Sequence, residues 1–109
     1  MAVVTIEAGA PCATLINTFT TTPENQQHIL DILLEATEKH IAQLPGFICA
    51  NFHKTSDGTR IVNYAQWKTK QDHLNMLSDP VAARHISELR QLAAVDAHIY
   101  EVVRTFAAT

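Results

Sequence analysis

Hydrophobic and polar residues alternate along some stretches of the chain and follow a helical period along others. The central stretch from Pro45 to Trp67 is predicted to form two strands joined by a tight turn. Asp57-Gly58 supplies this turn, because glycine adopts a positive φ at little cost and aspartate tolerates it. Residues 13–20 are rich in β-formers and predict an earlier strand. A last strand is predicted over about residues 97–106, with apolar residues on both faces.

The intervening stretches carry helix signals. Thr21-Thr22-Pro23-Glu24 fits a helix start, either as a capping box or as an N-cap followed by proline. An apolar stripe at helical spacing then continues to about residue 43. Thr69 and Asp72 form a second capping signature before a short helix over about residues 70–78. Asp79-Pro80 begins another helix over about residues 80–93.

The predicted order of elements is β-α-β-β-α-β, with the second helical region broken at Asp79-Pro80. This is the split βαβ, ferredoxin-like plan, an α+β fold. The length of 109 residues fits one domain, in which residues 1–11 form an N-terminal arm or an edge strand. Helices cover only one face of such a sheet, although the hairpin and the last strand are apolar on both. We therefore predict a homodimer whose two sheets pack face to face.

The composition of the chain argues against some kinds of partner and some cellular locations. The chain is 47% hydrophobic, carries a net charge of −3 and has no basic cluster, which argues against a nucleic-acid partner. Its apolar runs are shorter than the roughly 18 residues that a membrane span needs. Residues 1–11 lack the pattern of a secretory signal, so we expect a cytoplasmic protein without membrane association. In that compartment Cys12 and Cys49 are expected to be free thiols.

Candidate binding groups share one face of the predicted strand that ends at Trp67. Side chains alternate along a strand, so Asn63, Ala65 and Trp67 point the same way. An amide and an indole with a small alanine between them leave room beside two hydrogen-bond donors, as a small-molecule pocket requires. The alternative is that Trp67 is a core residue that ends the strand and that Asn63 caps a loop.

Two histidines are candidates for a catalytic base, and His85 is preferred to His73. His85 falls within the apolar stripe of the 80–93 helix, and His73 follows Trp67 on the short helix. An imidazole titrates near neutral pH and so takes a proton readily, although a histidine on an apolar helical face is also typical of a hydrogen-bonded core residue. Asn17 is polar in an apolar strand, so it either lines a pocket or faces water. There is no Gly-rich phosphate loop and no paired-histidine zinc motif, so we expect neither a nucleotide cofactor nor a metal.

Several of these motifs together resemble the antibiotic biosynthesis monooxygenase superfamily. They are Pro-Gly-Phe, Asp-Gly-Thr-Arg, Asn-Tyr-Ala-Gln-Trp, Asp-Pro and His85, and the resemblance covers about residues 13–104. The stretch from Asn63 to Trp67 is similar to the motif of small cofactor-free monooxygenases that oxidise aromatic polyketide hydroquinones or anthrones to quinones. The resemblance implies a dimeric α/β barrel with one pocket per subunit between sheet and helices. It also implies a small aromatic substrate, O₂ and no cofactor.

The resemblance also implies roles for individual positions. Asn63 and Trp67 correspond to residues implicated in catalysis in that group. Two of its pocket tyrosines correspond to Phe52 and His73 here, and its helical arginine has no clear match near Ile86. These departures leave the identity of the substrate open.

A second branch of the superfamily, the haem-degrading monooxygenases, is similar at fewer positions. Asn17 and His85 fall where that branch has an asparagine and an axial histidine, but its tryptophan position is Met76 here. Three classes of function therefore remain: a cofactor-free monooxygenase, a haem-binding or haem-degrading protein, and a non-enzymatic small-molecule-binding or stress-associated dimer.

Overall fold

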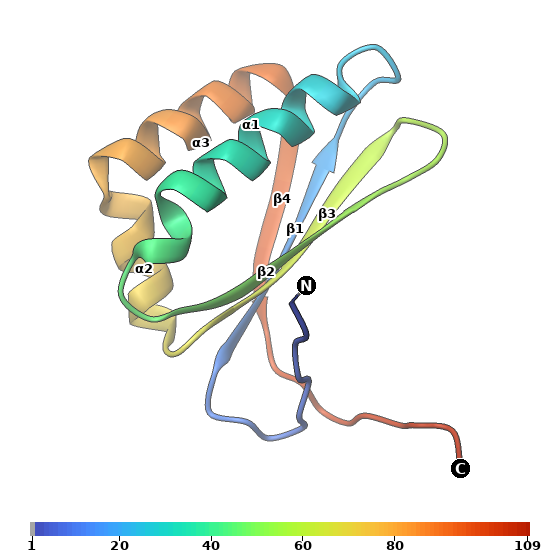
Figure 1. The fold of residues 1–109 in the computed structure, drawn as a ribbon, viewed down its shortest axis with the longest axis vertical. Helices are drawn as coiled ribbons and strands as arrows, with labels where there is room; N and C mark the ends of the chain where they lie inside the picture. Colours follow the sequence, from blue (N-terminus) through green and yellow to red (C-terminus); the bar gives the residue numbers. More distant parts are fainter. Residues whose placement is uncertain (1) are drawn as a thin grey trace.

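Four antiparallel strands form one sheet, and three α-helices lie together on one of its faces (Figure 1). This computed structural model describes residues 2–109. The strand order is β2-β3-β1-β4, so the predicted ferredoxin-like α+β fold is confirmed. The elements are β1 (Ala13–Thr20), α1 (Gln26–Lys39), η1 (Ile41–Gln43, a 3₁₀ helix), β2 (Phe47–Lys54), β3 (Arg60–Trp67), α2 (Lys70–Ser78), α3 (Pro80–Leu92) and β4 (Ala94–Tyr100).

The register of the strands aligns four residues in one row across the sheet. Asn17 of β1 lies opposite Asn63 of β3 on one side and opposite Ala97 of β4 on the other. Phe52 of β2 is the partner of Asn63 on its far side. Two amide side chains on adjacent strands thus lie in register beneath the helices.

The core divides into two clusters of buried side chains between sheet and helices. One cluster is formed by Phe19, Ile29, Leu33, Ile61 and Leu89. The other is formed by Trp67, Met76 and Ala82. The helices therefore pack against the sheet through two separate clusters, and a space remains between sheet and helices.

The helix starts at Thr69 and Asp79 are confirmed. The hydroxyl of Thr69 accepts a hydrogen bond from Asp72 N (3.0 Å), and the carboxylate of Asp79 accepts one from Ala82 N (3.1 Å). These contacts satisfy backbone N–H groups that a helix leaves free in its first turn. Pro80 occupies a first-turn position of α3, where no N–H is needed.

The predicted boundaries of the first helix are wrong at both ends. The helix begins at Gln26, because the Thr21 hydroxyl donates to Gly58 O (2.7 Å) in the β2–β3 loop and so does not cap the helix. Asn25 instead accepts a hydrogen bond from Thr22 N through its side chain (2.7 Å). The helix ends at Lys39, and residues 41–43 form η1.

The last strand begins and ends earlier than predicted. It spans Ala94–Tyr100, because it pairs with β1 from Thr20 back to Thr14 and β1 itself starts at Ala13. Residues 101–109 run away from the sheet as an extended segment (Figure 1), and Val103 and Phe106 on it are each 83% exposed.

Residues 2–11 form an arm and not an edge strand. The arm lies against the sheet near the C-terminal end of β3, where Gln66 Nε2 donates to Thr5 O (3.0 Å). A contact from Gly9 N to Val102 O (3.3 Å) joins it to the C-terminal segment.

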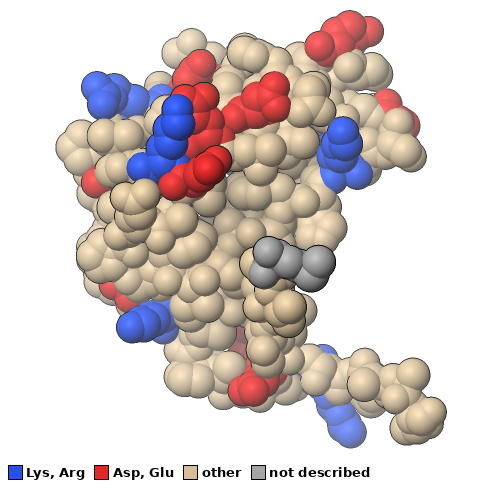
Figure 2. Space-filling view, viewed as in Figure 1, with Lys and Arg blue, Asp and Glu red and all other residues tan. Residues whose placement is uncertain are grey.

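The sheet face opposite the helices is mixed in character. Thr14, Tyr64 and Gln66 lie on it beside Ile16 and Val62, so it is less apolar than the sequence analysis expected. Figure 2 shows acidic and basic side chains interspersed over the helices, with no continuous basic patch on the face in view. None of the helices in residues 2–109 has the length and hydropathy needed to cross a membrane.

Candidate active site

A cavity of about 280 Å³ lies between the inner face of the sheet and the three α-helices. Its wall is largely apolar, and side chains from all four strands contribute to it. Every residue that the sequence analysis selected lines this wall, so the structure brings those residues together, while their roles remain predictions. They are Asn17, Phe52, Asn63, Trp67, His73, Met76 and His85.

Asn63 is buried in the middle of β3 and does not cap a loop, contrary to one of the two interpretations of its sequence position. Its Oδ1 accepts a hydrogen bond from Asn51 N on the neighbouring strand (3.1 Å). This contact identifies the oxygen side of the amide, and Nδ2 is left as its donor.

Asn17 lies beside Asn63 in the row across the sheet, and its Oδ1 is buried without a hydrogen-bond partner in residues 2–109. Buried polar atoms are nearly always paired in folded proteins, because an unpaired one forfeits its hydration. An unpaired carbonyl oxygen at a cavity wall is the kind of group that a bound ligand satisfies.

Trp67 ends β3 and is only 1% exposed. Its ring packs edge-on against Phe47 (centroids 5.5 Å apart) and against His73 (6.1 Å). It belongs to a core cluster and also lines the cavity, so both interpretations of its position hold. This packing holds the indole in place, and its N–H is a donor only.

His73 and His85 line the cavity from different helices and in different surroundings. His73 of α2 is 8% exposed, and its Nδ1 is buried with no partner in residues 2–109. Burial lowers the pKa of His73, so this imidazole is neutral at physiological pH. His85 of α3 is half-buried, near the exposed Glu35 of α1.

Phe52 and Met76 form apolar parts of the wall, on β2 and α2. At both positions the side chain adds hydrophobic surface and no strong hydrogen-bonding group. Asn17, His85 and Met76, the positions compared with the haem-degrading branch, also line this cavity.

The cavity wall carries basic side chains and no acidic ones among the described residues. No Asp or Glu of the described chain lines the cavity, although the protein has 11 acidic residues and a net charge of −3. The wall instead carries three histidines and Arg90 of α3. Such a surface favours an anionic ligand over a cationic one.

Arg90 was not predicted to line the site. The helical arginine of the resembling enzymes has no match near Ile86, but Arg90 lies one helical turn further along the same face of α3. The i, i+4 spacing of a helix would have found it. Ala97 and His98 of β4 also line the cavity and were missed, although the predicted last strand contains both, because the way they face depends on the register of β4 against β1.

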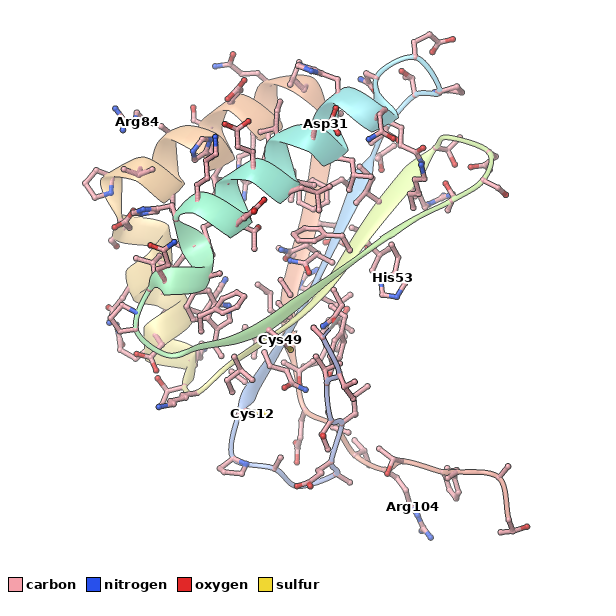
Figure 3. The ribbon with its side chains drawn as sticks, viewed as in Figure 1. Cys12, Asp31, Cys49, His53, Arg84 and Arg104 are labelled. Carbon is pink, nitrogen blue, oxygen red and sulfur yellow. The ribbon has the colours of Figure 1, made fainter. Side chains whose placement is uncertain are left out.

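The described residues form no obvious metal site. Within residues 2–109 no three His, Cys, Asp or Glu side chains are grouped so that they could hold a metal ion. Cys12 and Cys49 are both free thiols, as predicted. Figure 3 shows both in the lower part of the molecule, with His53 turned outwards from the hairpin.

Comparison with known proteins identifies the family to which the chain belongs. The model of the antibiotic biosynthesis monooxygenase family matches residues 13–88. The chain belongs to this family, which confirms the resemblance seen in its motifs.

One curated relative and two solved structures make the comparison more specific. The chain is 37% identical over 105 residues to tetracenomycin-F1 monooxygenase from Streptomyces glaucescens, which covers 96% of this chain and 94% of that protein. Its fold is similar to SnoaB, a cofactor-independent oxygenase from Streptomyces nogalater (22% identity, TM-score 0.74, covering 91% of this chain and 100% of that one). It is also similar to a monooxygenase from the gene ActVA-Orf6 of Streptomyces coelicolor, solved with nanaomycin D (24% identity, TM-score 0.76, covering 92% and 94%).

Proposed function

We propose that this protein is a cofactor-independent monooxygenase that oxidises an electron-rich aromatic, polyketide-type molecule with O₂. The observation that carries the proposal is the cavity itself, whose wall includes the amide of Asn63 and the indole of Trp67 and, among the described residues, no carboxylate. The 37% identity to tetracenomycin-F1 monooxygenase supports a related substrate class. The similarity of the fold to SnoaB, described as cofactor-independent, supports a reaction without a bound cofactor.

The reaction needs no external reductant. An anthrone-type substrate exchanges a CH₂ group for a carbonyl: R₂CH₂ and O₂ give R₂C=O and H₂O, so the substrate supplies all four electrons that reduce O₂. The enzyme must remove a proton from the substrate, stabilise the resulting anion and keep it close to O₂ in a site that excludes water.

The side chains of the cavity divide these tasks. Asn63 Nδ2 and the Trp67 indole N–H donate hydrogen bonds to the oxygen on which negative charge develops, and such donors are typically worth a factor of about 10² to 10³ in rate. His85 takes the substrate proton, since a partly exposed imidazole can exchange it with solvent. Phe52 and Met76 pack against the aromatic rings, and Asn17 accepts a hydrogen bond from a substrate hydroxyl.

We also propose that the protein is a cytoplasmic homodimer. The outer face of the sheet bears half-buried apolar side chains, and the segment after β4 exposes Val103 and Phe106 in an extended conformation. A second copy would cover both, as one chain does not. Sedimentation at about twice the 12.1 kDa mass of one chain would support the dimer, and a monomer at micromolar concentration would contradict it.

The function is tested by O₂ uptake with metal-stripped protein and a panel of anthrones and hydroquinones, beside Asn63→Ala and Trp67→Phe. We expect uptake above the uncatalysed rate, with loss in both variants. Tight binding of the aromatics without uptake would instead indicate a binding protein. A Soret shift on hemin titration that is lost in His85→Ala would indicate the haem-binding alternative.

A further inference from the structure

Two buried side-chain atoms in residues 2–109 have no hydrogen-bond partner, Asn17 Oδ1 and His73 Nδ1, and both residues line the cavity. Asn17 already has a place in the proposed reaction. His73 needs its own explanation, because an imidazole that only supports a fold normally pairs its ring nitrogens.

Other histidines of this chain show what such pairing looks like. Three of them have a carboxylate or a backbone carbonyl within hydrogen-bonding distance. The partners are Asp79 Oδ2 for His40 (2.5 Å), Asp96 Oδ1 for His98 (2.6 Å) and Asn51 O for His53 (3.0 Å). In the described part of the chain His73 has neither kind of partner, and the neighbouring carboxylate, Asp72, accepts a hydrogen bond from the Thr69 hydroxyl instead (2.9 Å).

The burial of His73 Nδ1 without a partner indicates which ring nitrogen carries the proton. A neutral imidazole carries one N–H and one lone pair. Orphaned N–H groups are rarer in folded proteins than under-satisfied acceptors, so the atom without a partner is the one that bears the lone pair. The proton therefore resides on Nε2, the ring nitrogen available to a ligand in the cavity. Burial, with no carboxylate in the cavity wall, lowers the pKa of His73 and keeps the ring neutral.

We propose that His73 donates a hydrogen bond from Nε2–H to the substrate oxygen on which charge develops, as a third N–H beside Asn63 and Trp67. The ring lies edge-on to the indole of Trp67, with centroids 6.1 Å apart, so both donors approach the same end of the cavity. A neutral imidazole is a suitable donor here, because it polarises an oxygen without transferring its proton. His73 is thus a catalytic residue but not the base of the reaction, and this inference rests on the proposed function.

Two substitutions separate donation from proton transfer. His73→Gln keeps an N–H donor and cannot act as a base, whereas His73→Leu has a similar size and no donor. With emodin anthrone and O₂ uptake as the assay, we expect kcat to fall about 10²-fold in His73→Leu and less than about 10-fold in His73→Gln. The matched control is His53→Gln, since His53 points outwards from the hairpin (Figure 3) and should keep the wild-type rate.

Either of two results would overturn the inference. Equal losses in His73→Gln and His73→Leu, both recovered at alkaline pH, would make His73 a base. A wild-type kcat in His73→Leu would remove it from the reaction. Thermal melting is the check on folding, and His73→Leu should melt no lower than wild type, because it removes an unpaired buried polar atom.

A measurement on the unmutated protein is independent of both variants. Long-range ¹H–¹⁵N NMR at pH 7 should show the His73 ring neutral with its proton on Nε2, and the Nε2 resonance should shift when the quinone emodin is added. A proton on Nδ1, a charged ring or no response to emodin would contradict the proposal. If wild-type protein consumes no O₂ with any anthrone, the proposed function fails, and the NMR result still decides the tautomer and the contact.

Discussion

Buried polar side chains lie both against the β2–β3 loop and in the wall of the cavity, but their hydrogen bonding differs. At the loop, Gln26 of α1 donates from Nε2 to Thr55 O and to Arg60 O (3.0 Å each), and the Thr21 hydroxyl donates to Gly58 O. In the cavity, Asn17 and His73 each have a buried atom with no hydrogen-bond partner among residues 2–109. Polar groups at the loop therefore stabilise the fold, while the unpaired atoms in the cavity cost stability.

This difference predicts that substitutions in the two regions separate activity from stability. The cavity substitutions should impair turnover and spare the fold. The loop substitutions should weaken the fold and spare turnover.

The largest expected effect is on turnover, at the donors of the cavity. Trp67→Phe removes the indole N–H and keeps an aromatic ring, so kcat should fall about 10²- to 10³-fold. The melting temperature of the variant serves as the control, and it should fall only modestly because the ring still packs against Phe47. Full turnover in Trp67→Phe would exclude the indole N–H from catalysis.

At the loop, Gln26→Leu replaces a buried amide by an apolar side chain of similar size. The carbonyls of Thr55 and Arg60 each lose one donor and keep a backbone N–H, so the free energy of unfolding should fall by about 1–2 kcal/mol, measured by urea denaturation. Gln26 does not line the cavity, and kcat/KM should remain within about twofold of wild type. If Gln26→Leu lost most of its activity and none of its stability, Gln26 would serve the reaction and not the fold.

Asn17→Val makes the converse change in the cavity. A β-branched side chain suits the strand and removes the unpaired oxygen, so the free energy of unfolding should stay the same or rise by up to about 1 kcal/mol. The KM for a hydroxylated anthrone should rise about 10-fold, since one hydrogen bond to the substrate is lost. An unchanged KM with lower stability would mean that Asn17 serves the fold.

The smallest expected effects are two pH-dependent changes in stability. The pKa of His73 is lowered in the fold, so the unfolded chain binds this proton more readily and stability should decrease as pH falls through about 6.5. At the loop, hydrogen bonds from Thr59 lower the pKa of Asp57 from 3.8 to about 2, so its contribution should be lost between about pH 4 and 2.

Urea titrations across both pH ranges measure these changes. His73→Gln should remove only the step near pH 6.5. Asp57→Asn should reduce only the loss of stability at acid pH, to which Asp79 also contributes because hydrogen bonds from Ala82 N and His40 lower the pKa of its carboxyl. Loss of both steps in either variant would contradict independent titration of the two regions.

Local features of the sequence were enough to predict much of this fold. The caps at Thr69 and Asp79 bond to N–H groups three residues away, and so they are visible in sequence. The Thr21 hydroxyl instead bonds to Gly58, 37 positions along the chain, and the ends of β4 depend on where β1 ends. Such long-range contacts override local propensity, which is why these boundaries were wrong.

The candidate site was predictable to a similar degree. Strand alternation placed Asn63 and Trp67 on one face, and the polar Asn17 in an apolar strand was one of two open interpretations. The family resemblance added Phe52 and Met76. That Asn17 lies beside Asn63 depends on strand register, and that His73 lacks a partner depends on the packing of α2 against the sheet. Neither the position of Asn17 beside Asn63 nor the unpaired nitrogen of His73 can be predicted from a sequence pattern.

The most direct test of the central claim is the fate of ¹⁸O₂ in single turnovers of emodin anthrone, comparing wild type with Trp67→Phe. The account predicts emodin with one ¹⁸O atom per molecule and a second in water, formed rapidly by metal-stripped wild-type protein and at least about 10²-fold more slowly by the variant. Emodin without ¹⁸O, or equal rates in the two proteins, would contradict a cofactor-independent monooxygenase whose reaction depends on the donors of this cavity.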